Sequence, residues 1–219
     1  WEVTVHPLLT PDAEKELLLL GNEAIVRGAL EAGLGFANTY PGTPSSEIAD
    51  TFFRLSAESD FYFEYSTNEK VATEVAFGAS VNGHLSCVFF KSVGLNVAAD
   101  SFVQLGHMEL TGGMVIVLGD DPGANSSQNE QDNRHFARLS YIPVFEPADP
   151  QEAYEMFLES ASLSTSRRMP VILRMTTHVC HAKQKVSFQG WDPLPMDRTP
   201  RFDPASGPYV PIARDALNL

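Results

Sequence analysis

The chain has 219 residues, of which 43% are hydrophobic and 20% charged, enough for one large α/β domain with a full core but short for two. Its formal net charge of −13 argues against nucleic-acid binding, and no apolar run approaches the roughly 20 residues of a membrane-spanning helix. Only two cysteines are present, so the chain cannot hold an iron–sulfur cluster unaided, and it fits a reducing, cytoplasmic compartment better than a disulfide scaffold.

Helical and strand patterns alternate along most of the chain. Helices are expected over residues 23–33, from Ser45 or Ser46 to 59, over 68–82, 95–110, through Arg138 and over 150–167, and strands over 36–40, 61–66, 85–91, 112–120, 143–148 and 170–177. Strands that alternate with helices predict an α/β fold, a doubly wound and mostly parallel sheet with helices on both faces.

The two ends of the chain differ from this pattern. Residues 1–18 are expected to be a leader, residues 19–180 the domain, and residues 181–219 an edge strand in KQKVSFQG followed by a Pro-rich linker or arm on a neighbour. The chain starts at Trp1 rather than Met, which suggests a processed chain or a piece of something longer.

Loops at the carboxyl ends of the predicted strands are where open α/β sheets bind ligands. Three loops are notable there, YPGTPSSE, STNEK and KSVGLN, and the polar loop DDPGANSSQNEQDN opens on the same edge. Glu69 of STNEK falls in the first turn of its helix, with Glu74 a weaker candidate one turn on. By position alone, Glu69 is an ordinary helix-start acid, favoured by the helix dipole by about 0.3–1 kcal/mol.

Six segments, taken together, favour a functional role for Glu69 over that of an ordinary helix-start acid. They are GNEAIVRGALEAG, YPGTPSSEI, STNEKVATEVAFGAS, KSVGLNVAAD, VIVLGDDPGANSSQNEQD and EPADPQEAYE. In this order they closely resemble the pyrimidine-binding, thiamine diphosphate domain of the 2-oxoacid:ferredoxin oxidoreductase family, and within it the large (alpha) subunit of the indolepyruvate branch.

The resemblance implies roles for the first two loops. Glu69, the acid of the NEK-type motif, would hydrogen-bond N1′ of the aminopyrimidine of thiamine diphosphate and so favour the imino form that takes up the thiazolium C2 proton. Pro41, Gly42 and Thr43 would lie beside the cofactor, with the Thr43 hydroxyl also near the substrate carboxylate and therefore catalytic. A Pro-flanked turn with a satisfied hydroxyl explains Thr43 equally well.

Five further residues are expected to bind the 2-oxoacid. They are Lys91, Gly94, Asn96, Ser127 and Gln128. Lys91 could offer a cation to a carboxylate or simply extend into solvent from the end of its strand. The run from Ser126 to Asn129 could line the substrate pocket, meet a partner domain or cap the next helix.

His178, Cys180 and His181 are arranged at first sight like metal ligands. In an extended segment His178 and Cys180 would share one face while His181 would point away. No fourth ligand is nearby, so no metal site is expected.

Two parts of a complete thiamine enzyme are missing. A diphosphate-binding domain carries GDG followed by Asn, but after Gly119-Asp120-Asp121 the matching window, residues 145–150, contains no Asn. Mg²⁺ and [4Fe–4S] clusters would therefore be held by a partner domain or subunit of a hetero-oligomer. The chain is then either a fragment or a split subunit.

The resemblance implies half of an oxidoreductase that decarboxylates a 2-oxoacid such as indolepyruvate, passes electrons to ferredoxin and forms an acyl-coenzyme A. Two alternatives stay open. One is a non-oxidative thiamine diphosphate decarboxylase or lyase, against which YPGTPSS and the DDPG segment speak. The other is a non-catalytic scaffold with the same fold, which the presence of Glu69 and Thr43 disfavours.

Overall fold

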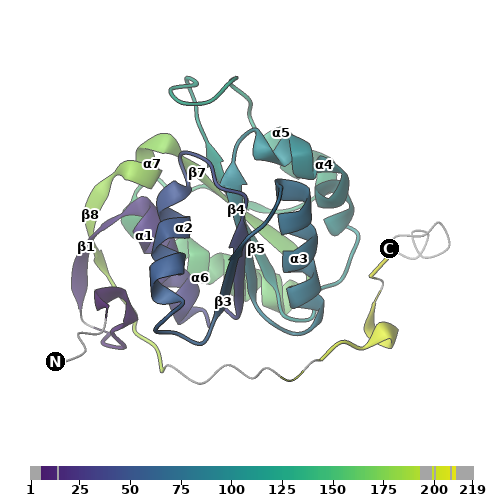
Figure 1. Ribbon diagram of the computed structural model, residues 1–219, viewed down its shortest axis with the longest axis horizontal. Helices are drawn as coiled ribbons and strands as arrows, with labels where there is room; N and C mark the ends of the chain where they lie inside the picture. The colour runs from purple at the N-terminus through teal and green to yellow at the C-terminus, as the bar shows by residue number, and fades with distance from the viewer. Residues whose placement is uncertain (1–5, 14, 193–198, 200, 208, 211–219) are drawn as a thin grey trace.

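The structure is a computed structural model that describes residues 6–13, 15–192, 199, 201–207 and 209–210. Its centre is a sheet of six parallel strands in the order β3-β2-β4-β5-β7-β6 (Figure 1). The strands are β2 (Phe36–Thr39), β3 (Tyr62–Tyr65), β4 (Ser86–Lys91), β5 (Met114–Asp120), β6 (Val144–Phe145) and β7 (Pro170–Thr176). β5 is buried along its whole length, which explains its continuous apolar sequence.

Helices cover both faces of this sheet. One face carries α1 (Gly21–Glu31), α2 (Ser46–Leu55), α6 (Pro150–Arg167) and the short α7 (Thr177–His181), and the other carries α3 (Glu69–Val81), α4 (Gly94–Leu105) and α5 (Arg134–Ser140). Two separate clusters of buried apolar side chains, one on each face, form the core. The predicted doubly wound α/β fold is confirmed.

The order of the strands places a switch point between β2 and β4. From β2 the chain passes through α2 to β3 at the edge, and it then returns through α3 to β4 on the other side of β2. The loops that follow β2 and β4 therefore leave in opposite directions, and a crevice at such a point is the usual ligand site of this architecture.

A second, two-stranded sheet lies beside the main one. β1 (Glu16–Leu20) pairs antiparallel with β8 (Lys183–Ser187), with Leu19 opposite Gln184. The strand expected in KQKVSFQG thus forms, but it pairs with residues expected to be a leader and not with the edge of the large sheet. The predicted boundary after residue 18 falls inside β1, and the division into domains stays a prediction. Residues 193–198 and 211–219 of the expected arm lie outside the described residues.

The fully buried Arg27 of α1 contacts two segments that flank the two-stranded sheet, one around residues 8–10 and the other around residues 188–191. The Arg27 guanidinium pairs with Glu31 at 2.5 Å and donates to the carbonyls of Leu8 and Thr10 at 2.8 and 2.6 Å. It also lies 4.0 Å from the ring centre of Phe188 and 4.3 Å from that of Trp191. Segments far apart in sequence therefore share one buried cation, which we call the Arg27 clamp.

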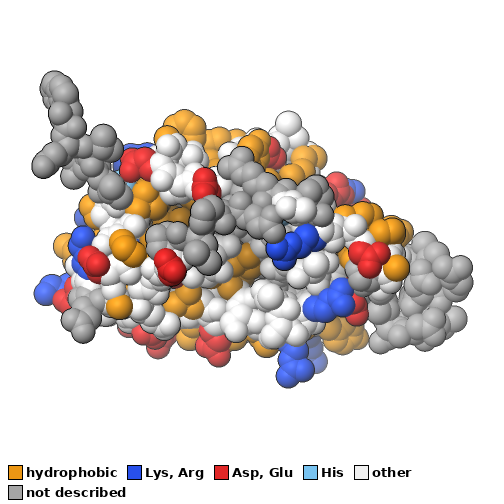
Figure 2. Space-filling model, turned by 90° about the horizontal axis from the view of Figure 1, so that it is seen from below, with side chains coloured by type: hydrophobic (Ala, Val, Ile, Leu, Met, Phe, Trp, Pro, Cys, Tyr) orange, Lys and Arg blue, Asp and Glu red, His pale blue; other side chains and the backbone are white. Residues whose placement is uncertain are grey.

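The remaining features are few. Two short 3₁₀ helices, η1 (Pro7–Leu9) and η2 (Pro204–Ser206), lie outside the two sheets. Among the described residues, no helix combines the length and the apolar character needed to cross a bilayer. Figure 2, which views the molecule from below, shows acidic and basic side chains scattered among apolar ones.

Candidate active site

The predicted site residues gather at the carboxyl ends of β2 and β4. A Cβ atom built on Gly42, in the loop after β2, would lie 2.8 Å from Cδ of Lys91, the last residue of β4. The absence of a side chain at Gly42 therefore lets the two loops touch across the switch point. Pro41 and Thr43, on either side, are exposed.

Glu69 is the first residue of α3 and is nearly buried, with 6% of its surface exposed. The helix starts there because the Asn68 side chain accepts a hydrogen bond from the Val71 backbone N–H at 2.9 Å. Gly94, at the start of α4, faces the carboxylate: a Cβ there would lie 2.6 Å from Glu69 Oε1. Only glycine leaves room for the acid at this place.

The surroundings of Glu69 favour its neutral form. Burial raises the pKa of this carboxyl, while its own backbone N–H and the charge of Lys91 act in the opposite direction. Within the described part of the chain, no other residue donates a hydrogen bond to the carboxylate. A buried carboxyl that no other residue meets is costly, so this one is suited to accept a donor supplied by a ligand.

Lys91 is linked to the polar loop after β5. Its Nζ donates to Oε1 of Gln128 at 3.0 Å, so the cation and the exposed amide lie together on the edge that carries Glu69. Asn96 does not join this pair. Its amide forms two reciprocal hydrogen bonds of 2.9 Å with Gln131 at the return of the loop.

Asp121 gives the loop its shape. Its carboxylate accepts hydrogen bonds from the backbone N–H groups of Ser126 and Ser127 at 2.7 and 3.0 Å, and from Thr177 Oγ1 at 2.8 Å. The Ser126 N–H contributes most to lowering the pKa of Asp121. The Ser127 hydroxyl is buried and has no partner among the described residues. Residues 126–129 do not cap α5, which begins after Asn133.

Thr43 lies in a turn closed by the Ser45 N–H, which donates to the Gly42 carbonyl at 3.1 Å. Its side chain is exposed, and its hydroxyl makes no hydrogen bond to any residue that the structure describes. The turn predicted from the prolines is therefore present. The hydroxyl is available to a ligand, and its role stays a prediction.

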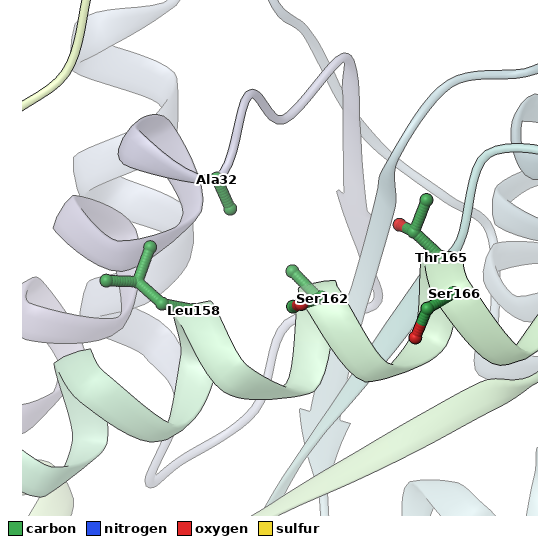
Figure 3. A pocket seen from close by; sticks show the side chains of 6 residues that line it. Ala32, Leu158, Ser162, Thr165 and Ser166 are labelled. Carbon is green, nitrogen blue, oxygen red and sulfur yellow. The ribbon is translucent and has the colours of Figure 1, made fainter.

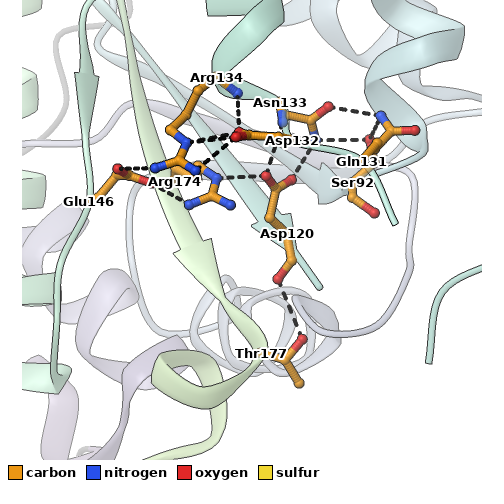
Figure 4. Close-up of polar contacts among 9 residues, drawn as sticks. All are labelled: Ser92, Asp120, Gln131, Asp132, Asn133, Arg134, Glu146, Arg174 and Thr177. Atoms are coloured by element: carbon orange, nitrogen blue, oxygen red, sulfur yellow. Dashed lines mark hydrogen bonds and ion pairs between the residues drawn. The ribbon is translucent and has the colours of Figure 1, made fainter. Parts of the chain in front are cut away.

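A buried charge network behind the site was missed from the sequence. Asp120 is fully buried at the end of β5, where it accepts hydrogen bonds from Arg174 Nε at 2.6 Å and from the backbone and side chain of Asn133 (Figure 4). Burial raises the pKa of Asp120, and Arg174 opposes that shift. Arg174 also pairs with Glu146. The only signal in the sequence was an acid at the end of an apolar strand.

The same network reaches the loop after β4. Asn133 Nδ2 and Gln131 Nε2 donate to the Ser92 carbonyl at 3.1 and 3.0 Å. Ser92 lies between Lys91 and Gly94, so the network fixes the turn that carries both predicted residues.

The segment with His178, Cys180 and His181 is helical, not extended as expected. The Thr176 hydroxyl caps it by accepting a hydrogen bond from the Val179 N–H at 3.4 Å, and Cys180 is buried while both histidines are exposed. In the part of the chain that is described, no three His, Cys, Asp or Glu side chains are grouped as a metal ion would need.

A surface pocket of about 420 Å³ lies at the opposite edge of the sheet. It is formed by the end of α1 at Ala32 and by one side of α6, with Leu158 and Thr165 among its lining residues (Figure 3). None of the predicted site residues lines it, so it does not belong to the candidate site.

Comparison with known proteins gives one family. The model of the family described as "Pyruvate flavodoxin/ferredoxin oxidoreductase, thiamine diP-bdg" matches residues 27–216. Indolepyruvate oxidoreductase subunit IorA of Methanothermobacter marburgensis is 52% identical over 76% of this chain and 27% of its own length. The subunit of that name from Archaeoglobus fulgidus is 50% identical over 81% of this chain and 29% of its own length. The chain thus spans less than a third of these relatives.

A solved structure shows the same fold. The 2-oxoglutarate:ferredoxin oxidoreductase from Magnetococcus marinus, with 2-oxoglutarate, coenzyme A and succinyl-CoA bound, matches with a TM-score of 0.70 at 19% identity. The match covers 80% of this chain and 32% of that one.

Proposed function

The chain belongs to the family of pyruvate flavodoxin/ferredoxin oxidoreductase thiamine diphosphate-binding domains, and from this premise we propose that it is the pyrimidine-binding half of an oxidative 2-oxoacid decarboxylase. The substrate is an aryl pyruvate such as indolepyruvate, the electrons pass to ferredoxin, and the product is an acyl-coenzyme A. Relatives at 52% and 50% identity that are named indolepyruvate oxidoreductase subunits support this choice of substrate.

The single observation that carries the proposal is the Glu69 carboxyl. It is buried, faces the bare backbone of Gly94 and has no partner from another described residue. These properties fit an aminopyrimidine, whose ring nitrogen can share a proton with a carboxyl of raised pKa. Bound thiamine diphosphate would supply an electron-accepting ring that eases the loss of carbon dioxide from a 2-oxoacid. Glu69 holds and moves the proton at that ring nitrogen.

Other predicted residues lie at the same edge of the sheet as this acid. Lys91, in contact with Gln128, offers a cation at the same edge for the substrate carboxylate. Thr43 adds an unengaged hydroxyl, with Pro41 and Gly42 beside the cofactor.

Three further residues were assigned to substrate binding. Ser127 offers a buried hydroxyl without a partner, and Gly94 leaves space next to Glu69. Asn96 is engaged by Gln131, so it would have to exchange that contact for one to the substrate.

The remaining chemistry belongs to partners. Mg²⁺, the diphosphate site and [4Fe–4S] clusters lie on companion domains or subunits of a cytoplasmic hetero-oligomer, which also binds coenzyme A and ferredoxin. The two cysteines of this chain are both buried and far from a cluster-binding arrangement, which supports that division of labour.

The test is Glu69→Gln in the complete enzyme, which keeps the shape of the side chain and removes its titrating proton. Indolepyruvate-dependent reduction of a viologen dye should fall by about 100-fold or more, while the far-UV circular dichroism spectrum stays unchanged. Binding of thiamine diphosphate, measured by calorimetry, should weaken as well.

Glu74→Gln is the matched control, because Glu74 lies on the same helix but is exposed and bonded to Ser101. This variant should keep full activity. Near-normal turnover in Glu69→Gln would overturn the proposal. Formation of an aldehyde without a reduced acceptor in the wild-type enzyme would favour a non-oxidative decarboxylase.

A further inference from the structure

Asn22 is fully buried, and its side-chain amide has no part in the proposed chemistry. It is the second residue of α1, and its Nδ2 donates one hydrogen bond of 2.7 Å to the Pro44 carbonyl and another of 2.7 Å to Glu47 Oε2. Pro44 follows Thr43, and Glu47 lies in the first turn of α2. One amide group therefore connects α1 to the last part of the loop after β2 and to the first turn of α2.

The loop around Thr43 has few other attachments. The Ser45 N–H and hydroxyl both donate to the Gly42 carbonyl, which closes the turn on itself without tying it to the rest of the fold. Pro44 packs against Gly119 of β5, where a Cβ would lie 3.0 Å from Pro44 Cδ. Among the described residues, Asn22 is the one donor to the Pro44 carbonyl. The position of Thr43 over the sheet therefore depends on this hydrogen bond, on the packing of Pro44 against Gly119 and on the contact of Gly42 with Lys91.

Neighbouring charge makes the amide hard to replace. Glu47 also lies 3.6 Å from Nε2 of His181 on α7, so three helices meet at this point. A carboxylate in place of the Asn22 amide would face both the Glu47 carboxylate and the Pro44 carbonyl. A side chain with no donor would leave two acceptors without their partner.

We propose that Asn22 is a positioning residue that holds Thr43 in place for the ligands of the active site. The inference rests on the proposed function, since it takes Thr43 as a contact for the cofactor and the 2-oxoacid. A loop that is already fixed loses little freedom when a ligand binds, whereas a loosened loop must be ordered at that moment. Loss of the Asn22 hydrogen bond to Pro44 therefore raises the KM and the dissociation constant of the cofactor more than it lowers kcat.

The experiment compares Asn22→Ala with wild type in the complete enzyme. The KM for indolepyruvate and the dissociation constant for thiamine diphosphate should each rise by about tenfold, with kcat changed far less. Asn82→Ala is the control. It removes a side-chain hydrogen bond of 2.8 Å to the Gly78 carbonyl at the other end of α3, and it should leave both binding constants unchanged.

A swap variant separates the two contacts of Asn22. Asn22→Asp alone places two carboxylates together and should lower both the melting temperature and the affinities. Adding Glu47→Gln provides an amide donor for the new carboxylate, so the melting temperature should recover. The Pro44 carbonyl still lacks its donor, so KM should stay raised. Recovery of wild-type KM in the double variant would overturn the role given to the Pro44 contact.

The outcomes also distinguish this inference from the proposed function. Normal turnover in Glu69→Gln would overturn the function itself, whatever Asn22 does. If Glu69→Gln is inactive but Asn22→Ala behaves like Asn82→Ala in KM and in cofactor affinity, the function stands and the positioning role fails. A lower melting temperature in Asn22→Ala without any change in those constants would mean a purely structural residue.

Discussion

The carboxylate of Glu69 occupies the space that any side chain on Gly94 would need. In Gly94→Ala the new Cβ would lie 2.6 Å from Oε1, so the acid must move away from the start of α4. We expect weaker binding of thiamine diphosphate and a lower melting temperature, measured by calorimetry and by thermal unfolding.

Gly78→Ala is the matched control for this variant. No atom lies within 4 Å of a Cβ built there, and the position is inside α3. Replacement of an unhindered helix glycine should stabilise the protein by about 0.5–1 kcal/mol. Cofactor binding by this variant should match wild type. Equal effects of the two substitutions would contradict the steric argument.

The raised pKa of Glu69 predicts a pH-dependent cost to the ligand-free protein. Since the folded state favours the protonated form, the cost is absent below the unfolded pKa, about 4.3, and grows as the pH rises through the higher folded pKa. Glu69→Gln removes the cost. The variant should therefore gain stability over wild type between about pH 4 and pH 7. Urea unfolding at both pH values measures this, and a constant difference would contradict it.

Some residues of the candidate site could be predicted from the sequence, and others could not. Loops at strand ends singled out Glu69, Lys91 and Gln128, the family resemblance gave Glu69 its role, and the structure brings the three to one edge of the sheet. Asn22 and Arg174 were missed because their partners, Pro44 and Asp120, are distant in sequence and only the folded sheet makes them neighbours. A buried polar residue inside a helix or strand carries no local sign of its partner.

The positions of most helices and strands were easier to predict than the pairing of strands that lie far apart in sequence. Continuous apolar runs placed β4, β5 and β7 to within a few residues, since strands buried on both faces need such sequences. β1 was missed because its pairing partner, β8, lies far along the chain. The short α7 was taken as extended because five residues are too few for a helical period to appear.

The Asp120–Arg174 pair connects β5 and β7 from within the protein. Arg174→Met leaves the Asp120 carboxylate buried with its cation removed, which should lower the free energy of unfolding by about 3 kcal/mol in urea titrations. Adding Asp120→Asn removes the unpaired buried charge and should restore at least half of the lost free energy of unfolding.

The control is Arg134→Met, in which an exposed arginine loses its pairs with Asp132 and Glu146. Solvent screens these surface pairs, so little change in stability is expected. If the single variants at Arg174 and Arg134 were equally stable, the buried pair would contribute no more than a surface one.

At the scale of the whole molecule, the Arg27 clamp attaches two segments that are distant in sequence, residues 8–10 and 188–191, to α1 and α6. Tyr154 of α6 joins it, donating to Glu31 at 2.7 Å and accepting from the Gln189 N–H at 2.6 Å. In Arg27→Met the carbonyls of Leu8 and Thr10 lose their donor. Limited proteolysis should then cut near residues 6–13 and 188–192 first, while the six-stranded sheet stays intact. Equal cleavage rates in variant and wild type would show that other contacts hold these segments.

The clamp also has an optical consequence. The 219 residues contain two tryptophans, and one of them, Trp191, lies 4.3 Å from the Arg27 guanidinium. The emission of an indole depends on the charge and water around it, so Trp1→Phe would leave one fluorophore whose signal follows that contact. Loosening of the two clamped segments could then be timed separately from unfolding of the sheet by stopped-flow fluorescence beside far-UV circular dichroism.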